Sequence, residues 1–229
     1  MLLFAILYTV FAKILKMGGD IPHYSVYLMT GTVFWSFFSE CTGQGIQAIV
    51  GRSDLLRKIS FPKWIIVVSS TITALINFLI NLCVIIVFAL LNGVTPSFTW
   101  LLAPLVILEL YLLSLGIAFF LGSINVKYRD ISSIWEVLMQ ALFYAVPIIY
   151  PITMVSASSA VAAKVLLLNP IAQVIQDARF LLITDQSITV WNYIDNIFLR
   201  FIPVLITLFI LTIGSIYFRK HSKYFAEEA

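Results

Sequence analysis

Long, uninterrupted apolar segments dominate this 229-residue chain. A helix needs about 20 apolar residues to cross the roughly 30 Å hydrocarbon layer of a bilayer. The apolar runs are continuous rather than alternating, so the pattern favours membrane helices over the strands of a barrel. The predicted spans are Tyr24–Val50, Trp64–Leu91, Trp100–Val126, Ile131–Tyr150 and Phe201–Phe218.

A further apolar stretch, Met1–Ala12, is too short for a complete span, because at 1.5 Å per residue it covers only about 18 Å. It lacks the basic start and the small-residue cleavage site of a signal peptide. We therefore interpret it as the second half of a helix whose beginning is missing. With the five segments above, it predicts about six transmembrane helices, the first of them truncated.

The stretch between Pro147 and Asn196 differs from every other connection. It contains Pro147, Pro151 and the pair Asn169-Pro170, followed by a moderately apolar run. It is too long for a bare loop in a compact protein and too broken for one straight span. We expect short re-entrant helices between the fifth and sixth spans. The predicted fold is thus an all-α integral membrane protein in which residues 1–229 form a single transmembrane domain.

Composition and charge placement support this class and predict an orientation. Hydrophobic residues make up 61% of the chain and charged residues only 11%, whereas a soluble domain carries about 25% charged residues. Lysine and arginine are enriched in cytoplasmic connections of membrane proteins. The side predicted to be cytoplasmic, together with the C-terminus, carries Arg52, Arg57, Lys58, Lys63, Lys127, Arg129, Arg219, Lys220 and Lys223.

A basic segment between the second and third predicted spans is the most informative cytoplasmic feature. Ser53 or Asp54 is suited to cap a short helix there, and Phe61-Pro62 would end it. Such a helix could dock a soluble partner, or it could simply anchor the chain at the headgroups. The docking candidates are Ser53, Asp54, Leu55, Leu56, Arg57, Lys58 and Phe61.

Polar and aromatic side chains inside the spans are candidates for a transport path. Glu40 and Glu109 lie midway along two spans, where charged residues usually face a bundle interior or a cavity. Asn77 and Asn81 share a helix face and are typical of interhelical hydrogen bonding. Aromatic residues commonly anchor the membrane interfaces, but their faces also suit sliding contact with sugar rings. The channel candidates are Trp35, Phe37, Phe38, Glu40, Glu109, Phe143, Tyr144 and Tyr150.

Motifs for chemistry within this chain are absent from the sequence. It has no G-x-x-x-x-G-K-[ST] loop for ATP, no H-E-x-x-H motif and no evident Ser/His/Asp set. Cys41 and Cys83 are isolated in apolar segments and are typical packing residues. We expect no catalytic residue, no metal site, no cofactor and no nucleic-acid partner.

Four segments resemble the membrane subunit of ABC-2 type exporters, in the branch that moves lipid-linked polysaccharides such as O-antigen and teichoic acid. The Asp54–Pro62 segment resembles the family's cytoplasmic coupling segment and is the most specific of the four. The other three are Gly31–Glu40, Asn125–Ile131, and Pro147–Pro151 followed by Leu168-Asn169-Pro170.

This resemblance implies a transport subunit rather than an enzyme. Two copies would pair around a channel in the bacterial cytoplasmic membrane, and each would dock a separate ATPase subunit that binds ATP and Mg²⁺. A lipid-linked glycan would be the substrate, and Arg179 could meet the carrier phosphate or serve as an interfacial anchor. The alternatives are an ABC-2 permease for a drug or small lipid and a membrane-embedded transferase acting on a lipid-linked sugar. An ion-driven transporter is less supported, because we find no inverted repeat.

Overall fold

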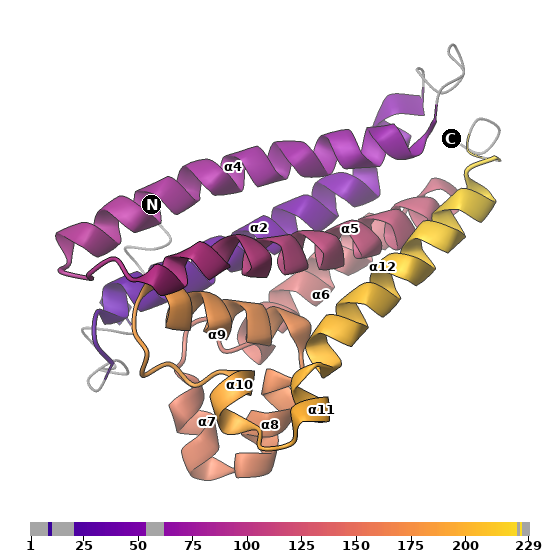
Figure 1. Cartoon of the computed structure of the whole chain (residues 1–229). Helices are drawn as coiled ribbons and strands as arrows, with labels where there is room; N and C mark the ends of the chain where they lie inside the picture. Colours follow the sequence, from indigo (N-terminus) through magenta and orange to yellow (C-terminus); the bar gives the residue numbers. More distant parts are fainter. Residues whose placement is uncertain (1–8, 11–20, 54–61, 224, 226–229) are drawn as a thin grey trace.

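The computed structural model describes residues 9–10, 21–53, 62–223 and 225, and every regular element in these ranges is helical (Figure 1). This confirms the all-α prediction. The long helices are α2 (Tyr24–Gln47), α4 (Trp64–Leu91), α5 (Ala103–Lys127) and α12 (Ile202–His221). Helix α2 packs against both α4 and α5, and α12 packs along α5.

The number of helices able to cross a membrane is smaller than predicted. Within the described ranges, three helices are long and apolar enough: α4, the continuous helix Phe98–Lys127 that joins η3 (Phe98–Leu102) to α5, and α12. A bent pair of helices makes a fourth if it counts as one span. The prediction of about six spans is therefore not confirmed, and the stretch Met1–Ala12, predicted as part of a first span, lies almost wholly outside the described residues.

Two of the predicted spans depart from the expectation for physical reasons. Helix α2 is long enough to cross a membrane, but it contains many polar residues along its length. It is therefore not among the helices that are apolar enough to do so. Helix α6 (Ile131–Ala145) has 15 residues, and at 1.5 Å per residue it covers only about 22 Å. It ends early because Val146 is extended before Pro147, as proline disfavours helical backbone in the residue before it.

The region between α6 and α12 consists of short helices, as the sequence predicted. They are α7 (Ile152–Ser158), α8 (Ala160–Leu167), α9 (Pro170–Leu182), α10 (Val190–Tyr193) and α11 (Ile197–Arg200). Helices α8 and α9 meet at 93°. The side chain of Asn169 accepts a hydrogen bond from the Ile171 backbone N–H at 2.9 Å, and Pro170 fits the first turn of α9, where no backbone donor is needed.

Basic residues gather at one end of the long helices. Figure 1 shows the start of α4 and the ends of α5 and α12 at that end, opposite α7 and α8. Lys63, just before α4, donates a hydrogen bond from Nζ to the carbonyl of Ser222, just after α12. Arg52 ends the short helix η2 (Val50–Arg52), and Lys127 ends α5. The described basic residues of the predicted cytoplasmic group are thus consistent with one membrane face.

Glycines allow the closest contacts between the long helices. A Cβ atom on Gly214 of α12 would overlap the carbonyl of Gly116 on α5, and one on Gly116 would meet the backbone of Leu211. A Cβ atom on Gly45 of α2 would overlap the side chain of Ala118 on α5. Small residues at such positions let helix backbones approach closely, which is a common mode of packing in membranes.

Candidate substrate-binding groove

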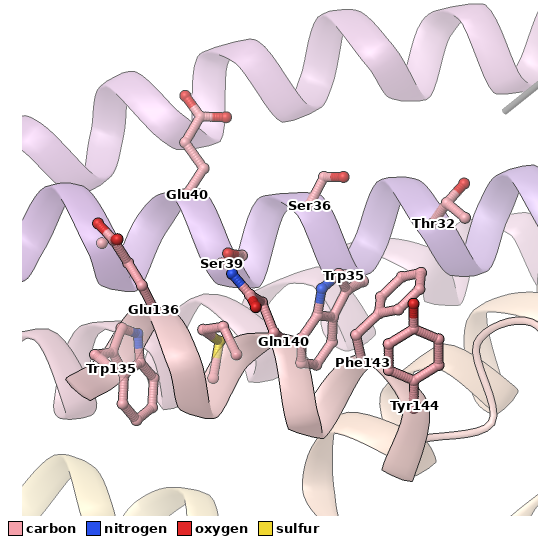
Figure 2. A pocket seen from close by; sticks show the side chains of 12 residues that line it. Thr32, Trp35, Ser36, Ser39, Glu40, Trp135, Glu136, Gln140, Phe143 and Tyr144 are labelled. Carbon is pink, nitrogen blue, oxygen red and sulfur yellow. The ribbon is translucent and has the colours of Figure 1, made fainter. Parts of the chain in front are cut away.

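An open groove with a volume of about 860 Å³ runs between α2 and α6. Figure 2 shows Trp35 of α2 close to Phe143 and Tyr144 of α6, whereas Glu40 is directed toward α4. We call it the α2–α6 groove. Its lining residues are Thr32, Trp35, Ser36, Ser39, Glu40 and Gly43 from α2, and Trp135, Glu136, Met139, Gln140, Phe143 and Tyr144 from α6.

The spacing of these residues explains why both helices present one continuous face. On α2 the lining positions recur at steps of three and one, and on α6 at steps of one and three. In both patterns a pair of positions recurs every four residues, which is close to the 3.6-residue turn, so each set forms a stripe along its helix. The stripe on α2 consists of small or polar residues and one tryptophan, whereas the stripe on α6 has three aromatic residues, one methionine, one glutamate and one glutamine.

Aromatic rings cluster at one end of the groove. The ring centroids of Trp35 and Phe143 lie 5.9 Å apart, and those of Phe143 and Tyr144 lie 5.3 Å apart, both edge to face. Trp35 is only 6% exposed, whereas Tyr144 is 70% exposed. The half-buried ring of Phe143 thus lies between the buried Trp35 and the exposed Tyr144, which offers a large amphipathic surface to a ligand.

Carboxylates and amides occupy the other end of the groove (Figure 2). Oε1 of Glu40 accepts hydrogen bonds from Nε2 of Gln44 at 2.9 Å and from Nδ2 of Asn77 on α4 at 2.8 Å. Nearby, Nε1 of Trp135 donates to Oγ1 of Thr42 at 3.0 Å, which ties α6 to α2. These bonds orient Glu40 and Trp135, so the polar end is held in a defined arrangement.

The structure brings only part of the predicted channel set into this groove. Phe37 and Phe38 lie in the hydrophobic core instead, with the Phe37 ring 4.6 Å from that of Phe78. Tyr150 donates its hydroxyl to the carbonyl of Ala145 and does not line the groove. Glu109 lines a separate cavity between α5 and α9.

The predicted docking segment lies mostly beyond the described ranges. Ser53 follows η2 and is partly exposed at the basic end of the molecule. The remaining docking candidates lie outside the described residues: Asp54, Leu55, Leu56, Arg57, Lys58 and Phe61.

Arg179 on α9 is placed differently from the prediction. Its side chain is 0% exposed, and its guanidinium lies 3.6 Å from the centre of the Tyr27 ring. Nη1 donates to the carbonyl of Pro147 at 2.7 Å, and Nη2 donates to that of Ile148. Nε donates to the carbonyl of Tyr27 at 3.1 Å. These bonds join α9 to α2 and to the end of α6, and in this conformation a carrier phosphate has no access to the guanidinium.

Several groove residues were missed by sequence reasoning, chiefly Ser36, Ser39, Trp135, Glu136 and Gln140. A signal was present, because α6 carries its polar and aromatic residues on one face and large aliphatic ones on another. Within the described ranges, no group of three or more His, Cys, Asp or Glu side chains is placed to hold a metal ion.

Fold and site together define a helical membrane protein with a lateral groove lined by aromatic and polar side chains. The chain belongs to the ABC-2 type transporter family, whose model matches residues 1–183. It is 33% identical over 170 residues to the O-antigen export system permease protein RfbA of Myxococcus xanthus, a match that covers 74% of this chain and 63% of that protein.

Two proteins of the same name from Klebsiella pneumoniae are similar over nearly the whole chain. They are 27% and 28% identical over 227 and 228 residues, which is 99% of this chain and 83% of each of those proteins. The resemblance inferred from the sequence is thereby confirmed at the level of the family.

Proposed function

We propose that this chain is the membrane subunit of an ABC exporter that moves a lipid-linked polysaccharide of the O-antigen type, with the α2–α6 groove as one wall of its path. Support comes from the relatives, which are named as O-antigen export permeases. The observation that carries the proposal is the groove itself. Its exposed Tyr144 and its polar residues match an amphipathic sugar chain, which presents apolar ring faces and many hydroxyl groups.

A second copy of this chain would complete the channel. The groove is open along one side, and large apolar residues beside it on α6 are exposed, namely Ile134, Val137 and Leu138. Exposed apolar residues at a rim suit contact with a protein partner or with lipid. A homodimer would place two such grooves face to face and would seal the path from lipid.

Energy for transport would come from a separate ATPase subunit that binds ATP and Mg²⁺. Two copies of it would dock on the two membrane subunits, at the segment that runs from Ser53 to Lys63. The basic residues at this end of the long helices favour a cytoplasmic location for the docking side and for the C-terminus. The host membrane is then the bacterial cytoplasmic membrane.

The two alternatives are not favoured. The relatives that match most of the chain are named for O-antigen export, rather than for a drug, a small lipid or a transfer reaction. Teichoic acid, another lipid-linked polymer, stays within the proposed substrate class.

An export assay tests the role of the groove. The chain and its ATPase would be expressed in a bacterium that lacks its own permease and accumulates the lipid-linked polymer inside. An aromatic contact contributes about 0.5–1.5 kcal/mol beyond burial, so Tyr144→Ala should lower surface polysaccharide roughly 2- to 10-fold. The matched control is Phe98→Ala, because Phe98 is an exposed aromatic residue outside the groove.

Co-purification of the ATPase separates a groove defect from a failure of assembly. We expect the Tyr144→Ala and Phe98→Ala variants to retain the ATPase equally. If the double variant Tyr144→Ala/Glu40→Gln exported polysaccharide at the wild-type level, the proposal that the groove forms part of the transport path would be contradicted. Export without any ATPase would contradict the exporter class.

A further inference from the structure

A second cavity, with a volume of about 490 Å³, lies between α5, α9 and α10, and it does not share residues with the α2–α6 groove. Three polar side chains from different parts of the sequence meet in its wall: Glu109 from α5, and Gln173 and Asp177 from α9. We call it the acceptor cavity. Nothing in the proposed transport path uses these residues.

A single amide joins the two carboxyl groups of the acceptor cavity. Nε2 of Gln173 donates to Oδ2 of Asp177 at 2.5 Å and to Oε2 of Glu109 at 3.4 Å. Nε1 of Trp191 on α10 also donates to Oδ2 of Asp177, at 3.1 Å. The available donors are therefore directed to one oxygen of each carboxyl group.

The remaining oxygens of these three residues have no hydrogen-bond partner within the part of the chain that the structure describes. They are Oε1 of Glu109, Oδ1 of Asp177 and Oε1 of Gln173. Gln173 is 2% exposed and Asp177 is 6% exposed. Burying an unpaired acceptor costs about 1–3 kcal/mol, and more if it is charged. A ligand that brings several donors and a positive charge would remove this cost.

Apart from Thr189, Trp191 and Asn192, the rest of the acceptor cavity lining is apolar. Leu102 and Leu105 line it and are largely exposed on the Phe98–Lys127 helix, which is apolar enough to contact lipid. Phe180 and Leu181 complete the apolar wall. The lining described here includes no Lys, Arg or His, so no positive side chain there offsets the carboxyl groups.

We propose that the acceptor cavity binds a primary ammonium group, because two carboxyl groups and an amide in its wall each keep one acceptor oxygen unpaired. The headgroup of an aminophospholipid, phosphatidylethanolamine, supplies this group from the membrane, and a small alkylammonium ion supplies it from water. The exposed leucines favour the lipid, because its glycerol and acyl chains would lie along that apolar wall while the ammonium enters the polar end.

Thermal unfolding in lipid nanodiscs tests the proposal with the full chain and its ATPase. Phosphatidylcholine is the matched lipid, because its ammonium group carries the same charge but no N–H donor. We expect a higher Tm in phosphatidylethanolamine than in phosphatidylcholine. The double variant Glu109→Gln/Asp177→Asn should remove this difference. The control Asp185→Asn should retain it, because Asp185 is an exposed carboxylate outside the cavity.

Native mass spectrometry would give the affinity directly. Loss of both charge-assisted contacts should weaken retention of phosphatidylethanolamine at least tenfold, and should leave retention of phosphatidylcholine unchanged. Ethylammonium added to phosphatidylcholine nanodiscs distinguishes the two sources. If it reproduces the stabilisation and tetramethylammonium does not, the ammonium comes from water.

Two results would overturn the proposal. Phosphatidylglycerol as effective as phosphatidylethanolamine would show that hydroxyl donors suffice and that no ammonium is selected. Equal Tm values of the wild-type protein in all three lipids, with no response to ethylammonium, would show that the cavity has no such ligand. The wild-type comparisons decide the question even if the double variant fails to fold.

Discussion

Helices α2 and α4 lie side by side and have similar lengths, yet they differ in both polarity and burial. Helix α4 has a mean hydropathy of 2.8 in its most apolar window, and only 22% of that window is buried. Helix α2 carries threonines, serines and Glu40, but most of its residues are buried between α4, α5, α6 and α9. The more apolar helix is the more exposed one.

This difference shows what hydropathy measures in a membrane protein. An exposed residue on α4, such as Ile76 or Ile80, faces a medium as apolar as itself, so the helix must be apolar. A helix enclosed by protein has no such requirement. On α2, Thr32 and Thr42 donate their hydroxyls to carbonyls in the preceding turn. Polar residues whose hydroxyls are satisfied in this way can therefore occupy α2 and form one face of a groove.

The largest loss of stability is expected on replacing Arg179, the buried polar side chain that connects α2 to α9 and has no equivalent on α4. Arg179→Ala would remove the donor to the carbonyls of Pro147 and Ile148, and it would remove the second donor to the carbonyl of Tyr27, which lies within α2. Each unpaired group costs about 1–3 kcal/mol, so stability should fall by roughly 3 kcal/mol or more. Chemical denaturation of the detergent-purified protein measures this loss.

Arg179→Lys sharpens the same test. Lysine keeps the positive charge, but its single ammonium cannot reproduce the planar fork of guanidinium donors, so it should restore stability only in part. Full restoration by lysine would show that the charge matters and that the three carbonyl bonds do not. If Arg179→Ala had the same denaturation curve as the wild-type protein, Arg179 would not stabilise the packing of α9 against α2.

A smaller effect is expected from two glycines on opposite faces of α2. Gly45→Ala would force a Cβ atom into the side chain of Ala118, whereas the position of a Cβ atom on Gly43 is open. Overpacking typically costs about 1–3 kcal/mol, while alanine in place of glycine favours a helix by up to about 1 kcal/mol. The two variants should therefore shift Tm in opposite directions. Equal shifts would show that α2 and α5 are less tightly packed than described.

The smallest effect concerns the hydrogen bond that joins the two helices. Asn77→Ala removes the donor from α4 to Glu40, and polar bonds between membrane helices contribute about 0.6 kcal/mol on average. The neighbouring change Ile76→Ala, on the exposed face of α4, should cost less than about 0.5 kcal/mol. A double-mutant cycle of Asn77→Ala with Glu40→Ala measures the coupling, and zero coupling would mean that the bond does not stabilise the pair.

The same contrast explains how far the sequence could predict the fold. The bounds of α4 agree with the prediction at both Trp64 and Leu91, because a helix in contact with lipid must be apolar over its full length. The end of α6 was predicted five residues too late, because the apolar run continues to Tyr150 although Pro147 stops the helix. Apolar composition indicates where lipid is, whereas proline and packing decide where a helix ends.

The groove was only partly predictable for a related reason. Trp35 and Phe38 were both expected at the channel, but they lie three positions apart, and only Trp35 lines the groove. Which side of a helix faces a cavity depends on its neighbours, and a sequence window does not contain them. Glu109 and Asp177 are distant in sequence and come together only through the packing of α5 with α9.

The glycine contacts between α5 and α12 have a mechanical consequence. Gly116 and Gly214 bring the two backbones together with no side chain between them that could change rotamer. We therefore expect α5 and α12 to move together as one rigid pair. The hydrogen bond from Lys63 to the Ser222 carbonyl connects the start of α4 to the end of α12. A displacement of the start of α4 should therefore shift α12 and α5 together along their whole length, rather than bend one of them locally.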